Sequence, residues 1–281
     1  MNIFFLVVST IFGLLVGSFL NVVALRFNTG KSLGGRSGCF SCGKQLVWYE
    51  LFPVFSWLAQ LGRCRGCSSK ISPQYILGEL AAGITYFLIA ARAFFVHGFD
   101  VVIDVNYLIG TIFLFVLFSV ALVILFYDIR HKIIPNELSF TFGLLSFLAL
   151  FFFGFEKLVF TYVGFHIPGV WQLLAGLIVP LPFVLIWLFS RGAWIGLGDP
   201  KFMVGMGFLF GISRGFSSVF LSFWVGALFV LAIGVINFIF KKRLLHEGKK
   251  SIMKSELPFA PFLIIATLIT VVCGFNFLAV V

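Results

Sequence analysis

Residues 108 to 136 read LIGTIFLFVLFSVALVILFYDIRHKIIPN. The first 20 of them carry no charged side chain, and a helix of about 20 apolar residues is long enough to cross a bilayer. Such runs recur along the 281 residues, of which 61% are hydrophobic and 11% are charged. Helices satisfy their own backbone hydrogen bonds in lipid, whereas a β-barrel needs alternating rather than continuous apolar runs. The sequence therefore predicts an all-α, polytopic helical membrane protein.

Eight apolar stretches of the sequence are candidates for membrane spans. We predict spans near residues 3–25, 76–96, 108–127, 137–153, 171–190, 201–213, 216–240 and 258–280. One sizeable polar block lies between the first two spans. The predicted organisation is a first transmembrane helix (1–25), a small cytoplasmic loop domain (26–75) and a transmembrane core (76–281).

The basic residues predict the orientation of the chain. If the N-terminus lies outside, the cytoplasmic segments are 26–75, 128–136, 191–201 and 241–257, and they hold 17 of the 20 Lys and Arg residues. Basic residues concentrate in cytoplasmic loops, so we expect this orientation. Topology thus explains the net charge of +10, and we expect membrane lipid rather than nucleic acid as the partner of these residues. The last segment is expected to anchor the topology and contact anionic head groups.

Four cysteines in the polar block have the spacing of a zinc site. Cys39 and Cys42 form one C-x2-C knuckle, Cys64 and Cys67 form another, and 21 residues separate the two. Two such knuckles can complete a tetrahedral tetrathiolate shell. Two disulfides are the alternative, but disulfides seldom persist in a reducing cytoplasm. We therefore expect structural zinc, because four thiolates leave no coordination position open for catalysis.

Two aspartates at the ends of predicted spans are candidates for chemistry. Asp128 follows the third span, and Asp199 lies in GLGDPK, residues 196–201. A carboxylate beside hydrocarbon is costly to ionise, and two neighbouring carboxylates can share one proton. An aspartic protease needs such a pair, in which one member takes a proton from water and the other polarises the scissile carbonyl. Gly196 and Gly198 would let the backbone approach Asp199 and a bound peptide closely.

Each aspartate also fits a structural role. Asp128 can pair with Arg130 or Lys132 at a helix end, and Asp199 before Pro200 suits a helix N-cap. A proton-coupled transporter would use the same two acids as a relay, although we find no convincing inverted repeats. A membrane-anchored zinc assembly module is a third hypothesis, but it leaves the Gly-x-Gly-Asp element unexplained.

Taken together, these motifs are similar to those of the type 4 prepilin peptidase family of bacterial membrane proteins. The resemblance covers most of the chain. It rests on both cysteine knuckles, the spacing from Asp128 to Pro135, and the elements GSFLNVV (17–23), PVFSWL (53–58), ISPQY (71–75), Glu79-Leu80, GLGD (196–199) and PFAP (258–261). Many relatives have proline where Phe40 stands and aspartate where Asn136 stands, but neither departure removes a thiolate or a candidate catalytic carboxylate.

The resemblance implies that Asp128 and Asp199 are a catalytic pair in a transmembrane aspartic peptidase core. They would cut the leader from prepilin or pseudopilin precursors at the cytoplasmic face of the bacterial inner membrane. The resemblance also implies N-methylation of the new N-terminus with S-adenosylmethionine, associated with the loop domain. The sequence carries no recognisable motif for this methyl donor, so the second activity rests on the resemblance alone.

Overall fold

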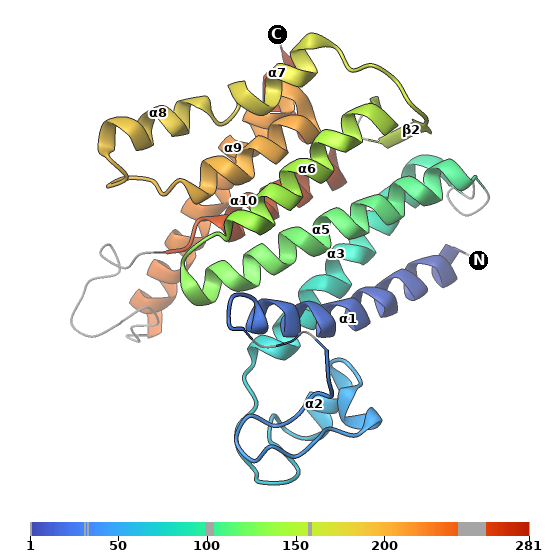
Figure 1. Ribbon diagram of the computed structural model, residues 1–281, viewed down its shortest axis with the longest axis vertical. Coiled ribbons are helices and arrows are strands. Elements are labelled where there is room, and N and C mark those ends of the chain that lie inside the picture. Colours follow the sequence, from blue (N-terminus) through green and yellow to red (C-terminus); the bar gives the residue numbers. More distant parts are fainter. Residues whose placement is uncertain are drawn as a thin grey trace. The chain divides into compact units, whose positions relative to one another are not determined.

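The computed structural model describes residues 2–30, 32, 34–98, 104–156, 159–240 and 257–280, and this part of the chain is mostly helical (Figure 1). Within the described residues, five helical stretches are long and apolar enough to cross a membrane: Ile3–Arg26, Gln74–Val96, Val105–His131, Val170–Ser190 and Gly198–Ile236. Two shorter apolar helices are Asn136–Phe152 and Ala260–Cys273. The prediction of a polytopic helical membrane protein is confirmed. The basic segment 241–257 lies, apart from Leu257, outside the described residues.

The chain divides into two compact units. One comprises Met1–Tyr127 and Val159–Val163, and the other comprises Asp128–Leu158 and Gly164–Val281. Helix α5 (Val105–His131) supplies residues to both units, because the division falls between Tyr127 and Asp128.

In the first unit, α1 (Asn2–Arg26) packs along α3 (Gln74–His97), and the loop between them carries η1 (Trp48–Leu51) and α2 (Phe55–Ala59). Tyr86 of α3 stacks on Phe115 of α5 with ring centroids 4.1 Å apart. Its hydroxyl donates to the Phe115 carbonyl at 3.2 Å, which satisfies a polar group inside the apolar helices. The loop is tied to α3 by the Val54 N–H, which donates to Oε2 of the buried Glu79 at 2.7 Å.

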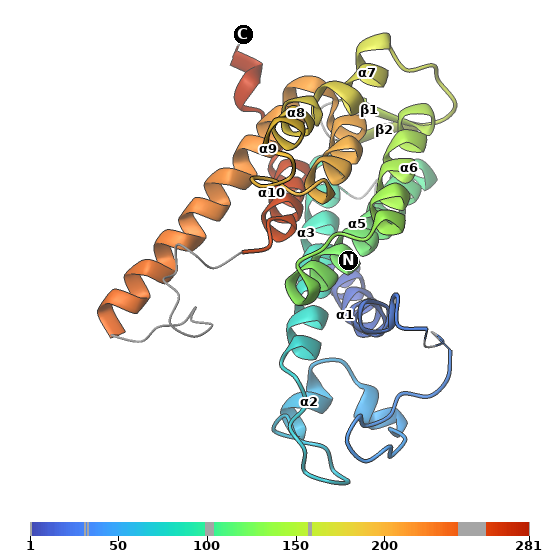
Figure 2. The same cartoon turned by 60° about the vertical axis from the view of Figure 1, so that its left-hand side comes forward.

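The second unit is arranged around α9, which consists of two helical segments joined by a kink at Gly211. Its elements are α6 (Asn136–Phe152), β1 (Phe153–Glu156), α7 (Val170–Ile178), α8 (Leu181–Ser190), α9 (Gly198–Phe240), α10 (Ala260–Cys273) and η3 (Phe277–Val280). Helices α6, α7 and α10 all pack on α9, and Figure 2 shows α10 lying beside it. The core on α9 includes Phe202, which stacks on Phe142 of α6 with ring centroids 4.3 Å apart.

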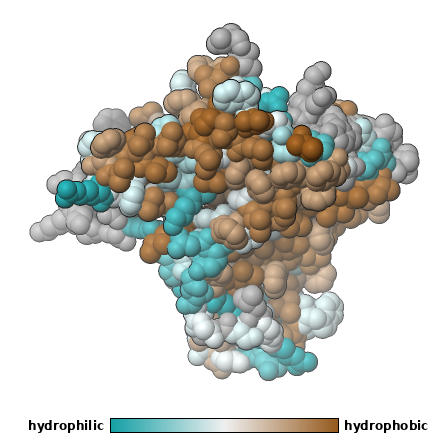
Figure 3. All heavy atoms as spheres, turned by 45° about the horizontal axis from the view of Figure 1, so that its top comes forward, coloured by the Kyte–Doolittle hydropathy of each residue, from teal (hydrophilic) through white to brown (hydrophobic). Residues whose placement is uncertain are grey.

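Apolar side chains cover much of the outer surface of these helices. Phe4 on α1, Leu77 on α3 and Leu228 on α9 are among the large exposed residues. Figure 3 shows broad hydrophobic areas interrupted by smaller hydrophilic patches. A water-soluble protein rarely exposes so large a continuous apolar area, so these surfaces suit contact with lipid tails.

Several predicted boundaries were wrong. The sixth and seventh predicted spans are two helices within α9, but the kink that joins them lies at Gly211 rather than between residues 213 and 216. The fifth predicted span consists of α7 and α8, which are separated at Pro180, a residue without the N–H that a continuous helix would use. The last span ends at Cys273 rather than 280, because Gly274 terminates α10 in a left-handed conformation. Two short strands, β1 and β2 (Val159–Val163), were not predicted.

The bend in α9 predicts unequal effects of two glycine substitutions. Gly211 has φ +73° and ψ −172°, a conformation accessible essentially only to glycine, whereas Gly234 is helical, and an added Cβ would meet no atom within 4 Å at either position. Gly211→Ala should therefore destabilise the protein by about 1–3 kcal/mol. Gly234→Ala should leave stability unchanged or raise it slightly. Unfolding in detergent measures both, and equal stability of the two variants would contradict the prediction.

Candidate functional site

Asp128 lies near the C-terminal end of α5 in an unfavourable position for a carboxylate. The residue is 4% exposed, and its Oδ2 is buried without a hydrogen-bond partner among the described residues. The C-terminal end of a helix carries partial negative charge, which disfavours a second negative group there. A buried polar atom without a partner is rare and costly in native proteins. Such an acid therefore requires a compensating contact or a function.

The start of α10 supplies one compensating contact. The backbone N–H of Ala260, the first residue of α10, donates a hydrogen bond to the Asp128 carboxyl group. The first N–H groups of a helix have no intrahelical partner and carry partial positive charge, so they favour a carboxylate. Pro261 follows at a position where a helix does not need an N–H. The PFAP element (258–261) thus begins a helix at the acid.

A sharp turn after Asp128 brings the chain back to α9. Lys132 has φ +55°, and its N–H donates to the Asp128 carbonyl at 2.7 Å. Ile134 is then buried against the start of α9, where a Cβ added to Gly198 would lie 3.0 Å from the Ile134 Cβ. A side chain at position 198 would push these segments apart. Glycine at this position therefore allows their close approach.

Asp199 follows in the first turn of α9. It is partly buried, and its carboxyl group is close enough to that of Asp128 for the two to interact electrostatically. Two residues further along, Lys201 donates from Nζ to Oδ1 of Asn136 at 2.6 Å. Asn136 begins α6, so this hydrogen bond ties the start of α6 to the start of α9. The turn and the two helix starts together bring the two acids near each other.

The structure can be compared with the ion pair that the sequence allowed for Asp128 and with the roles expected of the two glycines. Among the described residues, Asp128 forms no ion pair with Arg130 or Lys132. The close neighbour of Gly198 is Ile134, and the predicted approach of a bound peptide to Gly198 stays a prediction. At Gly196, an added Cβ would meet no protein atom within 4 Å.

Sequence reasoning did not single out Ala260, Ile134 or Lys201. Two signals were present: the PFAP element, which was noted only as part of the resemblance, and Asn136, which was noted only as a departure. The contacts of these residues join segments far apart in the sequence, so neither spacing nor composition could pair them.

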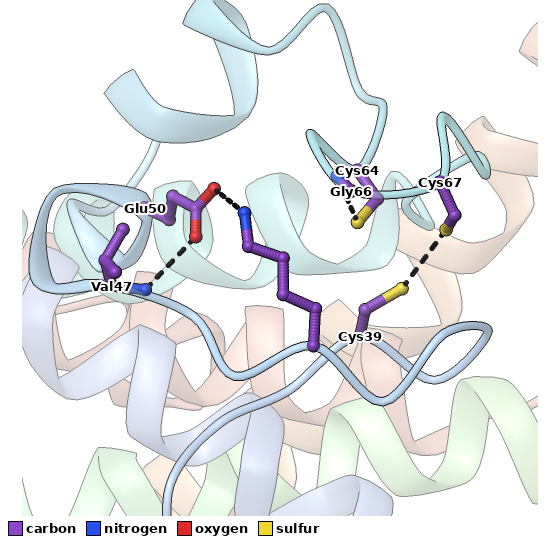
Figure 4. A network of polar contacts seen from close by, with 7 residues as sticks. Cys39, Val47, Glu50, Cys64, Gly66 and Cys67 are labelled. Atoms are coloured by element: carbon purple, nitrogen blue, oxygen red, sulfur yellow. Dashed lines mark hydrogen bonds and ion pairs between the residues drawn. The ribbon is translucent and has the colours of Figure 1, made fainter.

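The four cysteines of the loop domain converge on one point, and Figure 4 shows three of them. Their sulfur atoms all lie within 4.8 Å of one another, and the Sγ atoms of Cys39 and Cys67 are 3.8 Å apart. Tetrahedral zinc with bonds of about 2.3 Å requires sulfur atoms about 3.8 Å apart. All four cysteines are free thiols, so the disulfide alternative is not observed. The residues therefore fit a structural zinc ion.

The two knuckles share one backbone geometry. The N–H of the first cysteine donates to the carbonyl five residues later at 2.9 Å in both, from Cys39 to Lys44 and from Cys64 to Ser69. These bonds fold each knuckle into a tight turn whose two thiols face the same point. Two similar turns then supply the four ligands.

Hydrogen bonds favour the thiolate that zinc requires at Cys39 and Cys67, whereas the neighbouring thiols raise the pKa of Cys42. The backbone N–H groups of Cys42 and Ser41 lower the pKa of Cys39 to about 6. The N–H of Gly66 donates to Cys64 Sγ at 3.3 Å (Figure 4). Four neighbouring thiolates repel one another, and a divalent cation would offset that repulsion.

We predict one zinc ion per chain, held by these four cysteines. Cys64→Ser should lose most of the metal and make the loop domain sensitive to proteolysis, because zinc binding stabilises such small domains directly. Cys273→Ser, which alters the fifth cysteine on α10, is the matched control and should retain zinc. Elemental analysis and limited proteolysis of the purified proteins measure the two effects. Full zinc content in the Cys64 variant would contradict the assignment.

Two protein-family models match successive parts of the chain. The bacterial peptidase A24 N-terminal domain matches residues 11–93, which contain the four cysteines. The type IV leader peptidase family matches residues 115–231, which contain Asp128 and Asp199. Both parts of the chain that carry candidate chemistry are therefore covered.

Curated relatives share the name prepilin leader peptidase/N-methyltransferase. The Bacillus subtilis (strain 168) protein is 28% identical over 265 residues, covering 94% of this chain and 92% of that protein. The Vibrio cholerae serotype O1 protein is 28% identical over 221 residues, with coverage of 75% and 80%. The Myxococcus xanthus protein is 38% identical over 143 residues, which are 50% of this chain and 39% of that protein. No solved structure matches the chain. The chain is thus an enzyme of the type IV leader peptidase family.

Proposed function

We propose that the protein is a membrane aspartic peptidase in which Asp128 and Asp199 form the catalytic pair. The observation that carries the proposal is the electrostatic proximity of two acids that come from different helix ends. Two further features support it. One oxygen of Asp128 is buried without a partner among the described residues, and the contacts of Gly198 and Lys201 bring the acid-bearing segments together.

In the proposed reaction, one carboxylate takes a proton from a water molecule, whose oxygen attacks the scissile carbonyl carbon. The other carboxyl group is protonated and donates a hydrogen bond to the carbonyl oxygen. Collapse of the tetrahedral intermediate breaks the C–N bond, and a proton passes to the leaving nitrogen. The two roles belong to the pair, because coupled carboxyl groups titrate together. The Ala260 N–H would stabilise Asp128 whenever it carries negative charge.

The substrate we propose is a prepilin-like precursor, from which the enzyme removes the leader. The shared name of the relatives supports this substrate class. Asp128 and Asp199 lie at the ends of membrane-length helices, where a precursor with an apolar helix in the lipid would present its polar leader. The distribution of basic residues favours the cytoplasmic face of the inner membrane for this site.

We also propose that the enzyme methylates the newly exposed N-terminal amine with S-adenosylmethionine. The relatives' name supports this second activity, and the family model that contains the cysteines covers the loop domain with which we associate it. When bound, the donor would supply the methyl group. We assign it no residues.

Substitution of either aspartate tests the catalytic pair. Asp128→Asn and Asp199→Asn retain the side-chain shape but remove the acid, so each should slow leader removal by at least about 10²–10⁴-fold. The assay reconstitutes each protein with a pilin precursor and S-adenosylmethionine and follows leader removal by mass spectrometry. A precleaved substrate in the same assay reports methyl transfer separately.

Asp104→Asn is the matched control. This aspartate precedes the opposite end of α5 and accepts the Asn106 N–H at 2.8 Å, a capping role that asparagine can also fill. The control should cleave at the wild-type rate. If the Asp128 and Asp199 variants, folded and zinc-loaded, also cleave normally, the catalytic pair is wrong and a transporter hypothesis moves ahead.

Close packing at Gly198 predicts a loss of catalysis without loss of the acids. In Gly198→Ala the added methyl would lie 3.0 Å from the Ile134 Cβ, so Asp199 should move relative to Asp128. A displacement of about 1 Å can reduce turnover by up to about 100-fold. Gly196→Ala, whose methyl meets no protein atom within 4 Å, is the control for folding. Wild-type kcat in the Gly198 variant would show that this contact does not position the acid.

A further inference from the structure

The loop domain exposes a set of large apolar side chains that neither zinc binding nor the proposed catalysis uses. Trp48 is 75% exposed and Phe55 is 69% exposed. The exposed residues of η1, α2 and the segment between them form what we call the η1–α2 face: Trp48, Tyr49, Leu51, Phe52, Phe55 and Leu58. A domain surrounded only by water would rarely expose so many large apolar residues in so short a segment.

These side chains form a surface rather than scattered exposures. The ring centroid of Trp48 lies 5.7 Å from that of Tyr49 and 6.5 Å from that of Phe52. On α2, Phe55 and Leu58 are three residues apart and therefore lie on the same side of the helix. Because η1 and α2 pack against each other, the aromatic cluster and this side of α2 belong to one small structure.

The charge of the domain is suited to an anionic partner. Residues 26–75 contain seven Lys or Arg residues and one acid, Glu50. That acid is buried, pairs with Lys44 at 3.5 Å and accepts the Val47 N–H at 3.1 Å (Figure 4). The Arg65 guanidinium carbon lies 5.3 Å from the centre of the Tyr49 ring, which places a cation beside the apolar side chains. The domain thus combines exposed aromatic residues with an excess of positive charge.

A hydrogen bond attaches this segment to the start of the membrane-length helix α3. The Val54 N–H, between η1 and α2, donates to Oε2 of Glu79 at 2.7 Å. Glu79 is the sixth residue of α3, so it lies about 7.5 Å along the axis from the first residue, Gln74. The segment that carries the face is therefore attached to the first turns of an apolar span.

We propose that the η1–α2 face inserts into the interfacial layer of an anionic phospholipid bilayer. Tryptophan and tyrosine favour this layer because one part of each ring system is apolar and another is polar. Nearby Arg65 would contact phosphate head groups, and each basic residue at an anionic surface strengthens binding. A basic peptide segment or a second copy of this basic domain would be repelled, so lipid is the occupant that the charge favours.

Site-specific photocrosslinking of the full chain tests the proposal. We would place p-benzoylphenylalanine at Phe55 or Trp48 and reconstitute each zinc-loaded protein in nanodiscs of phosphatidylcholine with or without phosphatidylglycerol. The matched control carries the same group at Phe40, which is 77% exposed but lies on the first cysteine knuckle. Mass spectrometry then identifies what each position has captured. We expect lipid adducts at Phe55 and Trp48 to exceed those at Phe40 several-fold and to increase with phosphatidylglycerol.

A charge variant adds a second measurement. Arg65→Gln should lower the lipid adduct at Phe55 by up to about fivefold in phosphatidylglycerol discs and have less effect in phosphatidylcholine discs. Equal lipid adducts at Phe40 and Phe55 would overturn the proposal. So would capture of an added precursor or a second chain in place of lipid. Zinc content, measured on every variant, confirms that the loop domain is folded.

Discussion

The second unit depends on one constraint. A carboxylate is buried at the C-terminal end of a helix, where the helix dipole is unfavourable to it, and it must be compensated. Asp128 lies near the C-terminal end of α5, where the helix dipole opposes its charge. The free N–H of Ala260 at the start of α10 provides an opposing partial charge. Because only one side of the carboxyl group is satisfied in this way among the described residues, the acid remains available to a second group. The neighbouring carboxyl group of Asp199 is the candidate for this second group.

The same unit shows how local backbone features bring distant segments together. The left-handed Lys132 ends α5 and allows the chain to reverse, and the buried Ile134 then reaches Gly198. Each feature is small, but a Cβ at position 198 or a continuous helix through residue 132 would separate the segments that carry the acids. Proximity of the acids thus depends on backbone conformation as well as on the carboxylates themselves.

In the loop domain, metal ligation would replace many of the contacts that a hydrophobic core supplies. Two short knuckles bring four thiols within 4.8 Å of one another, and a structural zinc ion there would hold together a segment with few buried apolar residues. The large aromatic residues of η1 and α2 are consequently not needed inside the domain. Their segment is attached to the start of an apolar span through Val54 and Glu79, where exposure to lipid would be less unfavourable than exposure to water.

The sequence by itself determined the fold class, the cysteine cluster and the two candidate acids, because each follows from composition or short spacing. Continuous apolar runs require helices in lipid, and two C-x2-C knuckles have few other uses than metal binding. The sequence predicted the break in α9 between residues 213 and 216, whereas it lies at Gly211. In a chain with 29 glycines, the sequence does not reveal which glycine adopts a positive φ. Only the tertiary structure decided that Ala260 meets Asp128, that Ile134 meets Gly198 and that Lys201 binds Asn136. These are contacts between residues distant in sequence, and their formation depends on how helices pack, which periodicity and composition do not specify.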